Sequence, residues 1–141
     1  MRILGIDYGD ARVGVAITDA LNITVQGLET IQRNQSDKNV LKRLDEILKE
    51  YEVETIVVGL PLNLKGEKTE RTNITEKFIH KLKCKYNKIK IETMDERLTT
   101  VEAHKTMNFL NVDKNKKRSI VDTISAVYIL EAYIQKNNNK K

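Results

Sequence analysis

An aspartate interrupts the first apolar stretch of the chain, in the segment GIDYGDARVGV. Asp7 comes directly after Arg2–Ile6, which has the composition of a buried strand. A carboxylate in that position costs free energy to bury unless it is paired or binds a metal ion. The same residue can start a turn by accepting hydrogen bonds from the amides of Gly9 and Asp10. Asp7 alone is therefore compatible with a metal ligand and with a turn residue.

Two further acids, Asp95 and Glu96, follow the strand-like segment IKIETM at the start of MDERLTT. Functional groups of α/β sheets gather at the carboxyl ends of the strands. Two acids, Arg97 and two threonines at such an end have the chemistry to hold a metal ion and a phosphate. The alternative is a helix entry, in which Thr99 caps the helix and Glu96 forms a solvated ion pair with Arg97.

A third acid lies in the last helical pattern, IVDTISAVYILEAYI. This pattern is apolar on nearly every side, so we expect the helix to be largely buried. Asp122 is the one acid near its start. The alternative is again local, because Ser119 and Asp122 have capping-box spacing and an acid in a first turn suits the helix dipole.

Taken together, the three acids favour one shared site, because each lies at the end of an element that can reach one edge of a sheet. Convergent carboxylates repel each other and bind hard cations such as Mg²⁺ or Mn²⁺ through oxygen. A pair of such ions ~4 Å apart activates water and stabilises the leaving oxygen in phosphodiester cleavage. In a chain with 20 acidic residues the spacing permits this arrangement without requiring it.

The composition is that of a globular protein. The 141 residues, 40% hydrophobic and 32% charged, predict one domain with its own core. The single cysteine, Cys84, cannot form an internal disulfide, and no Cys/His cluster predicts zinc. The chain shows neither a signal peptide nor a span of ~20 apolar residues, so we expect a cytoplasmic protein without a membrane partner.

The basic residues are concentrated at the carboxyl end. From Lys114 onward seven Lys and Arg residues accompany two acids, so this segment carries the whole net charge of +5. A localised basic segment favours a nucleic-acid partner. Lys136, Lys140 and Lys141 flank an Asn run, which predicts a solvated tail. We therefore expect a single domain over residues 1–135 and a basic, flexible tail over 136–141.

The periodicity of apolar residues predicts an α/β protein with the order β-β-β-α-β-α-β-α-α. The expected strands are residues 2–6, 12–18, 24–31, 54–60 and 89–94. The expected helices are residues 37–51 and 71–83, a helix that begins at Thr99, and 120–134. Three antiparallel strands followed by strands with helical crossovers imply a mixed sheet with helices on its faces.

Four sequence motifs occur in order between residues 2 and 134: GIDYGDARVGVAITD, IVVGLPLNLKG, MDERLTT and RSIVDTISAVYIL. With these motifs the chain resembles the RuvC-like family also called YqgF or RuvX, whose members are named as Holliday junction resolvases and as pre-16S rRNA nucleases. The resemblance implies the ribonuclease H-like fold, an α/β fold with a five-stranded mixed sheet of order 3-2-1-4-5 flanked by helices.

The resemblance also implies site residues. The three acids of the family motifs fall on Asp7, Glu96 and Asp122, with Asp95 beside the second. Two glycine-containing motifs match as well, the turn D-x-G-x-x-R-x-G that ends at Gly14 and the strand end G-L-P at Gly59–Pro61. Where many relatives carry Ala-Ala after the helical acid, this chain has Ser125-Ala126, which is still small enough for close packing.

The leading functional prediction is a metal-dependent endonuclease that acts on structured RNA and processes the 5′ end of precursor 16S rRNA in ribosome biogenesis. Asp7, Glu96 and Asp122 would bind Mg²⁺ or Mn²⁺, and Asp95 is a further candidate ligand. The residues expected to contact the nucleic-acid backbone are Arg12, Arg97, Lys117 and Arg118. The assembling small ribosomal subunit is the expected partner, with the protein a monomer or a weak homodimer.

Two other functions fit the same residues. A Holliday junction resolvase would cut four-way DNA, and a symmetric junction requires a symmetric dimer. A nucleic-acid-binding module without catalysis is the second alternative. The D-x-G turn also resembles the phosphate hairpin of actin-like ATPases, but those proteins enclose their nucleotide between two such domains.

Overall fold

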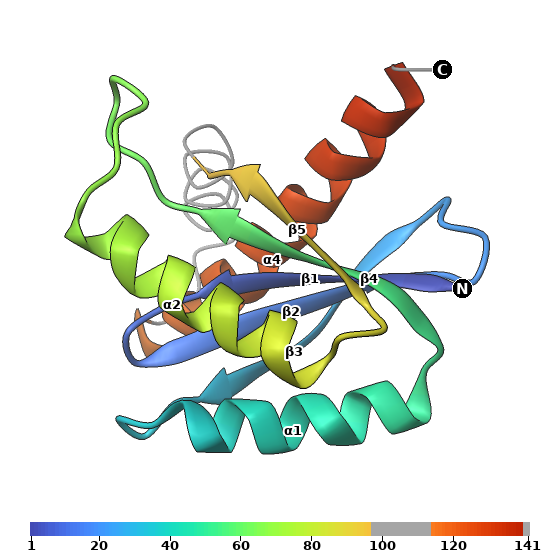
Figure 1. The fold of residues 1–141 in the computed structure, drawn as a ribbon, viewed down its shortest axis with the longest axis horizontal. Helices are drawn as coiled ribbons and strands as arrows, with labels where there is room; N and C mark the ends of the chain where they lie inside the picture. The colour runs from blue at the N-terminus through green and yellow to red at the C-terminus, as the bar shows by residue number, and fades with distance from the viewer. Residues whose placement is uncertain (97–113, 140–141) are drawn as a thin grey trace.

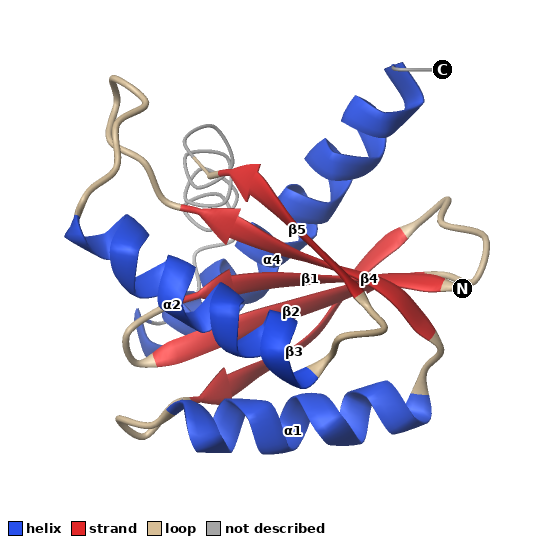
Figure 2. Ribbon diagram, viewed as in Figure 1, coloured by secondary structure: helices blue, strands red, loops and turns tan. Residues whose placement is uncertain are grey.

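A computed structural model describes residues 1–96 and 114–139, apart from the side chains of 114–122, 138 and 139. These residues form a five-stranded mixed sheet covered by helices on both faces (Figures 1 and 2). The strands are β1 (Arg2–Tyr8), β2 (Arg12–Thr18), β3 (Val25–Gln32), β4 (Val53–Leu60) and β5 (Lys90–Asp95). The described helices are α1 (Asp37–Glu50), α2 (Glu70–Lys85) and α4 (Lys114–Asn139). None of them is long and apolar enough to span a membrane.

The strand order is β3-β2-β1-β4-β5, which confirms the order expected from the resemblance. Strands β1, β2 and β3 pair in antiparallel fashion, whereas β1, β4 and β5 run parallel. Parallel strands end at the same edge of a sheet, so the carboxyl ends of β1, β4 and β5 lie together. This edge holds the site described below.

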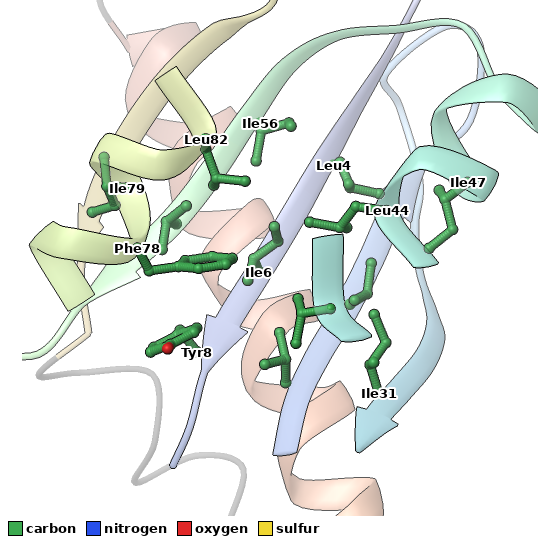
Figure 3. Packing of buried hydrophobic residues seen from close by; sticks show 14 of the residues in the cluster. Leu4, Ile6, Tyr8, Ile31, Leu44, Ile47, Ile56, Phe78, Ile79 and Leu82 are labelled. Carbon is green, nitrogen blue, oxygen red and sulfur yellow. The ribbon is translucent and has the colours of Figure 1, made fainter. Parts of the chain in front are cut away.

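The central strand β1 divides the molecule into two apolar clusters, because successive side chains of a strand point to opposite faces. Leu4 and Ile6 face α1 and α2, where they pack with Leu44 and Phe78 (Figure 3). Ile3 lies in the second cluster, in which α4 supplies Ala126, Ile129, Leu130 and Tyr133. Both faces of β1 are thus buried, as its apolar sequence predicts.

Glycines allow α4 to approach the sheet closely. A Cβ atom at Gly5 would lie 2.5 Å from the Cγ of Leu130 and 3.0 Å from the carbonyl oxygen of Ala126. A Cβ atom at Gly27 would lie 2.3 Å from the Cγ2 of Thr123. The glycine pattern of the sequence therefore reflects helix packing as well as turns.

The last helix is longer than expected. Apolar periodicity predicts residues 120–134, whereas α4 extends from Lys114 to Asn139 and so includes residues 136–139 of the expected tail. Polar residues at both ends carry no apolar period, but they continue the backbone hydrogen bonds of the buried centre. The helix predicted from Thr99 lies outside the described residues.

Candidate active site

Asp7 and Glu96 come together at the carboxyl edge of the parallel strands. Asp7 is near the end of β1, and Glu96 follows β5 directly. The amide of Glu96 donates a hydrogen bond of 3.2 Å to the carbonyl of Leu60, which holds the chain after β5 beside the end of β4. The side chains of Asp7 and Glu96 share a hydrogen bond, although β4 separates their strands.

Glycines flank Asp7 on both sides. Gly14 of β2 is its partner in the antiparallel ladder. On the other side Gly59 follows Val58, the partner of Ile6 in β4. A Cβ atom at Gly59 would lie 2.9 Å from the Cγ of Glu96 and 3.0 Å from its Cδ. The side chain of Glu96 thus crosses β4 over Gly59 to reach Asp7.

We expect Gly59→Ala to lower the cleavage rate, because a side chain at position 59 would obstruct the path of Glu96 to Asp7. The added methyl group would displace Glu96 and the Ile129 side chain, whose Cδ1 would be 2.5 Å away. Overpacking of this kind costs ~1–3 kcal/mol of stability, and a 1 Å displacement of a reacting group costs about 100-fold in rate. Cleavage rates and thermal unfolding would be measured on the same samples.

Gly5→Ala is the matched control, because it also crowds α4 but leaves the space under Glu96 unchanged. The expected result is similar destabilisation of the two variants and a much larger loss of rate in Gly59→Ala. Equal cleavage rates in the two variants would contradict the view that position 59 is a glycine because the Glu96 side chain crosses it.

The surroundings of Asp7 raise its pKa well above the ordinary value of an aspartate. Burial is the main cause, and the hydrogen bond and negative charge of Glu96 act in the same direction. The positive charge of Arg71 and a hydrogen bond from the Ser125 hydroxyl oppose the shift in pKa. Glu96 thus adds to the cost of ionising Asp7.

Arg71 reaches this edge from the first turn of α2. Its Nη2 donates to the carbonyl of Tyr8 at 2.8 Å, and its Nη1 pairs with the carboxylate of Asp10. The guanidinium therefore ties α2 to the turn between β1 and β2. It also places positive charge beside Asp7.

Tyr8 anchors the end of β1 on the opposite face. Its ring stacks on Phe78 with centroids 4.2 Å apart, and its hydroxyl donates to Oδ1 of Asp37 at 2.5 Å. Asp37 is buried at the start of α1 and also accepts from Arg33 at 2.8 Å and from Lys81 at 2.7 Å. Burial and the hydrogen bond to Asp37 raise the pKa of Tyr8 to about 12. This network fixes the strand end that carries Asp7.

The position of Asp122 is set by its neighbours on α4. The next residue, Thr123, bonds the hydroxyl of Thr30 at 2.8 Å, and Thr30 lies opposite Gly14, the ladder partner of Asp7. Asp122 directly precedes Thr123 in α4 and is three positions before Ser125. The start of the buried part of α4 therefore lies over the strand row that contains Asp7.

The structure describes the other predicted site residues only in part. Asp95 ends β5 opposite Leu60, and Arg12 begins β2, where its carbonyl accepts from the amide of Gly9 at 2.9 Å. Lys117 and Arg118 belong to α4. Their side chains and that of Asp122 lie outside the described part of the structure. Arg97 lies outside the described residues.

Sequence reasoning missed the role of Ser125 and underused Gly59. Ser125 was expected only to be small, yet its hydroxyl bonds Asp7. Its spacing of three residues from Asp122 was the available signal. In the sequence Gly59 is recognisable only as part of the G-L-P motif. Arg71 is a further residue of this edge, because it contacts the β1–β2 turn.

The donor set fits a hard divalent cation in its chemistry. Asp7 and Glu96 offer carboxylate oxygens, the ligands that Mg²⁺ and Mn²⁺ prefer. Burial and the neighbouring Glu96 raise the pKa of Asp7, and a bound cation would favour its ionised form. The described residues contain no group of three or more His, Cys, Asp or Glu side chains placed to hold a metal.

Similarity searches agree with this architecture. Residues 1–136 match the model of the family described as "RuvX: Holliday junction resolvase". A protein of Ruminiclostridium cellulolyticum named "Putative pre-16S rRNA nuclease" is 52% identical and covers 100% of this chain and 99% of its own. A protein of the same name from Acetivibrio thermocellus is 46% identical, with 95% of each chain covered.

Among solved structures, Thermus thermophilus RuvC superposes with a TM-score of 0.56 at 10% identity and covers 98% of this chain and 97% of its own. RuvC of the same organism in complex with a Holliday junction substrate superposes with a TM-score of 0.55 at 12% identity. This match covers 96% of this chain and 95% of the RuvC chain. At these identities the likeness shows the shared fold. The family match over nearly the whole chain and the two close relatives show more: the chain belongs to the RuvX family.

Proposed function

We propose that this chain is a metal-dependent endonuclease that processes the 5′ end of precursor 16S rRNA. The observation that carries the proposal is the pair of carboxylates, Asp7 and Glu96, held against each other at the carboxyl edge of the sheet. The substrate is inferred from relatives named as pre-16S rRNA nucleases, which match the chain over nearly its whole length.

Asp7 and Glu96 are the proposed ligands of Mg²⁺ or Mn²⁺. Asp122 is the proposed third ligand because of its place on α4, and Asp95 is a further candidate. A divalent cation held there would supply charge neutralisation at the phosphate and a more acidic water for phosphodiester hydrolysis, with a second cation in a two-metal scheme.

The other residues of the site position this pair and attract the substrate. Ser125 donates to the Asp7 carboxylate and holds its orientation, while Gly59 leaves room for Glu96. The guanidinium of Arg71 lies at the rim, where it can attract a phosphate of the nucleic-acid backbone. Arg12, Arg97, Lys117 and Arg118 remain the proposed backbone contacts of the flanking nucleotides.

A Holliday junction resolvase is the second candidate, favoured by the description of the matching family. The two functions differ in what they require of the protein. Resolution of a junction requires two active sites related by symmetry, whereas trimming of an RNA end requires one. The oligomeric state on the substrate therefore separates them.

The test is a cleavage assay with two labelled substrates, a precursor 16S 5′ fragment and a four-way DNA junction, each with Mg²⁺, Mn²⁺ or EDTA. We expect cuts in the RNA with either cation and none with EDTA. Glu92→Gln, which removes an acid of β5 that pairs with Lys90, should cut like the wild type. Cleavage of the junction alone would replace the proposal by the resolvase. Binding to RNA without cleavage under any condition would favour a non-catalytic module.

A further inference from the structure

The loop between β4 and α2 presents a leucine to solvent. The side chain of Leu64 is 94% exposed, the largest exposed fraction among the big apolar residues that the structure describes. Leu21 is next at 76%. Single exposed apolar residues are common on protein surfaces, so exposure alone assigns no role. The geometry of the loop and its place beside the acids give Leu64 its significance.

Hydrogen bonds hold the loop in one conformation. The Oδ1 of Asn63 accepts from the amides of Lys65 at 3.0 Å and Glu67 at 2.9 Å. The carbonyl of Asn63 accepts from the amide of Gly66 at 2.9 Å, and its amide donates to Glu67 at 3.0 Å. Gly66 supplies the left-handed backbone position, with a φ of 81°. Leu64 is therefore held outward by a formed turn.

The loop leaves the sheet at the edge that carries the acids. Its first residue, Pro61, follows Leu60, whose carbonyl accepts from the amide of Glu96. Leu64 is four positions after Leu60 in the chain, so the tip lies within ~14 Å of that strand end. Figure 1 shows the loop projecting from the end of the sheet where β1, β4 and β5 finish. Exposed Lys65 follows the leucine directly.

We propose that Leu64 packs against an unstacked base of the nucleic acid bound at the Asp7–Glu96 site, while Lys65 contacts a neighbouring phosphate. The inference rests on the proposed function. Apolar side chains of this size act as wedges between bases in nucleic-acid complexes, and RNA is recognised mainly where its bases are unpaired. Leu64 would thus select substrates with an unpaired nucleotide near the cleaved bond.

The test compares Leu64→Ser with Leu21→Ser, which removes an exposed leucine from the β2–β3 loop at the opposite edge of the sheet. The probes are the precursor 5′ fragment with 2-aminopurine at an unpaired position beside the cleavage site, and a fully paired duplex of the same sequence. Dissociation constants and 2-aminopurine emission are measured by titration. Both variants should keep the unfolding temperature of the wild type, since neither residue is buried.

We expect Leu64→Ser to bind the unpaired probe about tenfold more weakly, the scale set by burial of one leucine side chain. Binding to the duplex should not change, Leu64→Met should restore the wild-type values, and Leu21→Ser should match the wild type on both probes. Wild-type affinity and emission of Leu64→Ser on the unpaired probe would overturn the inference, even if the RNA is cut. A different outcome is that Leu64→Ser loses the base contact while the wild type cuts neither substrate. That outcome would refute the proposed nuclease activity and leave the role of Leu64 in base binding standing.

Discussion

Asp7→Asn is expected to lower the single-turnover cleavage rate by at least about 1,000-fold and to leave the protein folded. Stabilisation of transition-state charge by a bound cation is worth several kcal/mol, and each 1.36 kcal/mol is a factor of ten in rate. The amide keeps the shape of the carboxylate but removes the charge that holds the cation.

The same variant is expected to be at least as stable as the wild type. The pKa of Asp7 is raised in the folded state, chiefly by burial and then by Glu96, so its ionised form opposes folding at neutral pH. Thermal unfolding without divalent cations would show an unchanged or higher midpoint. A variant that cuts at the wild-type rate would remove Asp7 from the site, and an inactive but destabilised variant would make its role structural.

Asp37→Ala is expected to reduce the free energy of unfolding by about 2–3 kcal/mol at neutral pH. The substitution leaves the hydroxyl of buried Tyr8 without its acceptor, a loss of ~1–3 kcal/mol for a buried polar group. It also leaves Arg33 and Lys81 without the carboxylate that both of them contact. Urea unfolding monitored by circular dichroism would measure the change.

The contribution of Asp37 should depend on pH. Burial would raise its pKa, but hydrogen bonds from Lys81, Tyr8 and Arg33 outweigh burial, so the pKa lies below the ordinary value. A lowered pKa gives stability that is present above the unfolded-state pKa of ~3.9 and is lost as the pH falls through the folded-state value. The wild type should therefore lose stability below about pH 4 more steeply than Asp37→Ala.

Asp45→Ala provides the comparison on the exposed side of α1. Asp45 accepts from the hydroxyl of Tyr86 at 2.6 Å and pairs with Lys85 at 2.9 Å, but both charged side chains are 39% exposed. Solvent weakens such a pair, so its loss should cost less than the loss of Asp37. If the two substitutions lowered the free energy of unfolding equally, burial would not be the reason why Asp37 stabilises the fold.

Local patterns predicted the elements of the sheet, but they did not predict how its edge is assembled. The β-branched, largely apolar residues 54–60 predict a strand, which forms as β4 (Val53–Leu60). The strand order came from the resemblance, since apolar periodicity does not show which strands pair. Contact between Asp7 and Glu96 depends on a crossing over Gly59, a relation between three strands that no local spacing encodes.

Buried polar contacts were the least predictable part. In the sequence Asp37 is an ordinary acid in the first turn of a helix. Its burial becomes evident only in the folded chain, where Tyr8, Arg33 and Lys81 contact it from outside α1. The segment after Pro61 contains Asn, Lys and Gly residues, which are typical of a polar surface loop. The exposure of its leucine, Leu64, has no local signal in the sequence, because exposure is a property of the folded chain.

Binding of Mn²⁺ tests the central claim most directly, because it does not depend on the choice of substrate. Isothermal titration calorimetry at pH 7 would compare the wild type with Asp7→Asn, Glu96→Gln and the control Glu92→Gln. We predict that the wild type and the control bind Mn²⁺, and that Asp7→Asn and Glu96→Gln each bind it at least about tenfold more weakly, by removal of a ligand. Equal affinity of all four proteins, or no binding by the wild type, would contradict a metal centre at this pair of acids.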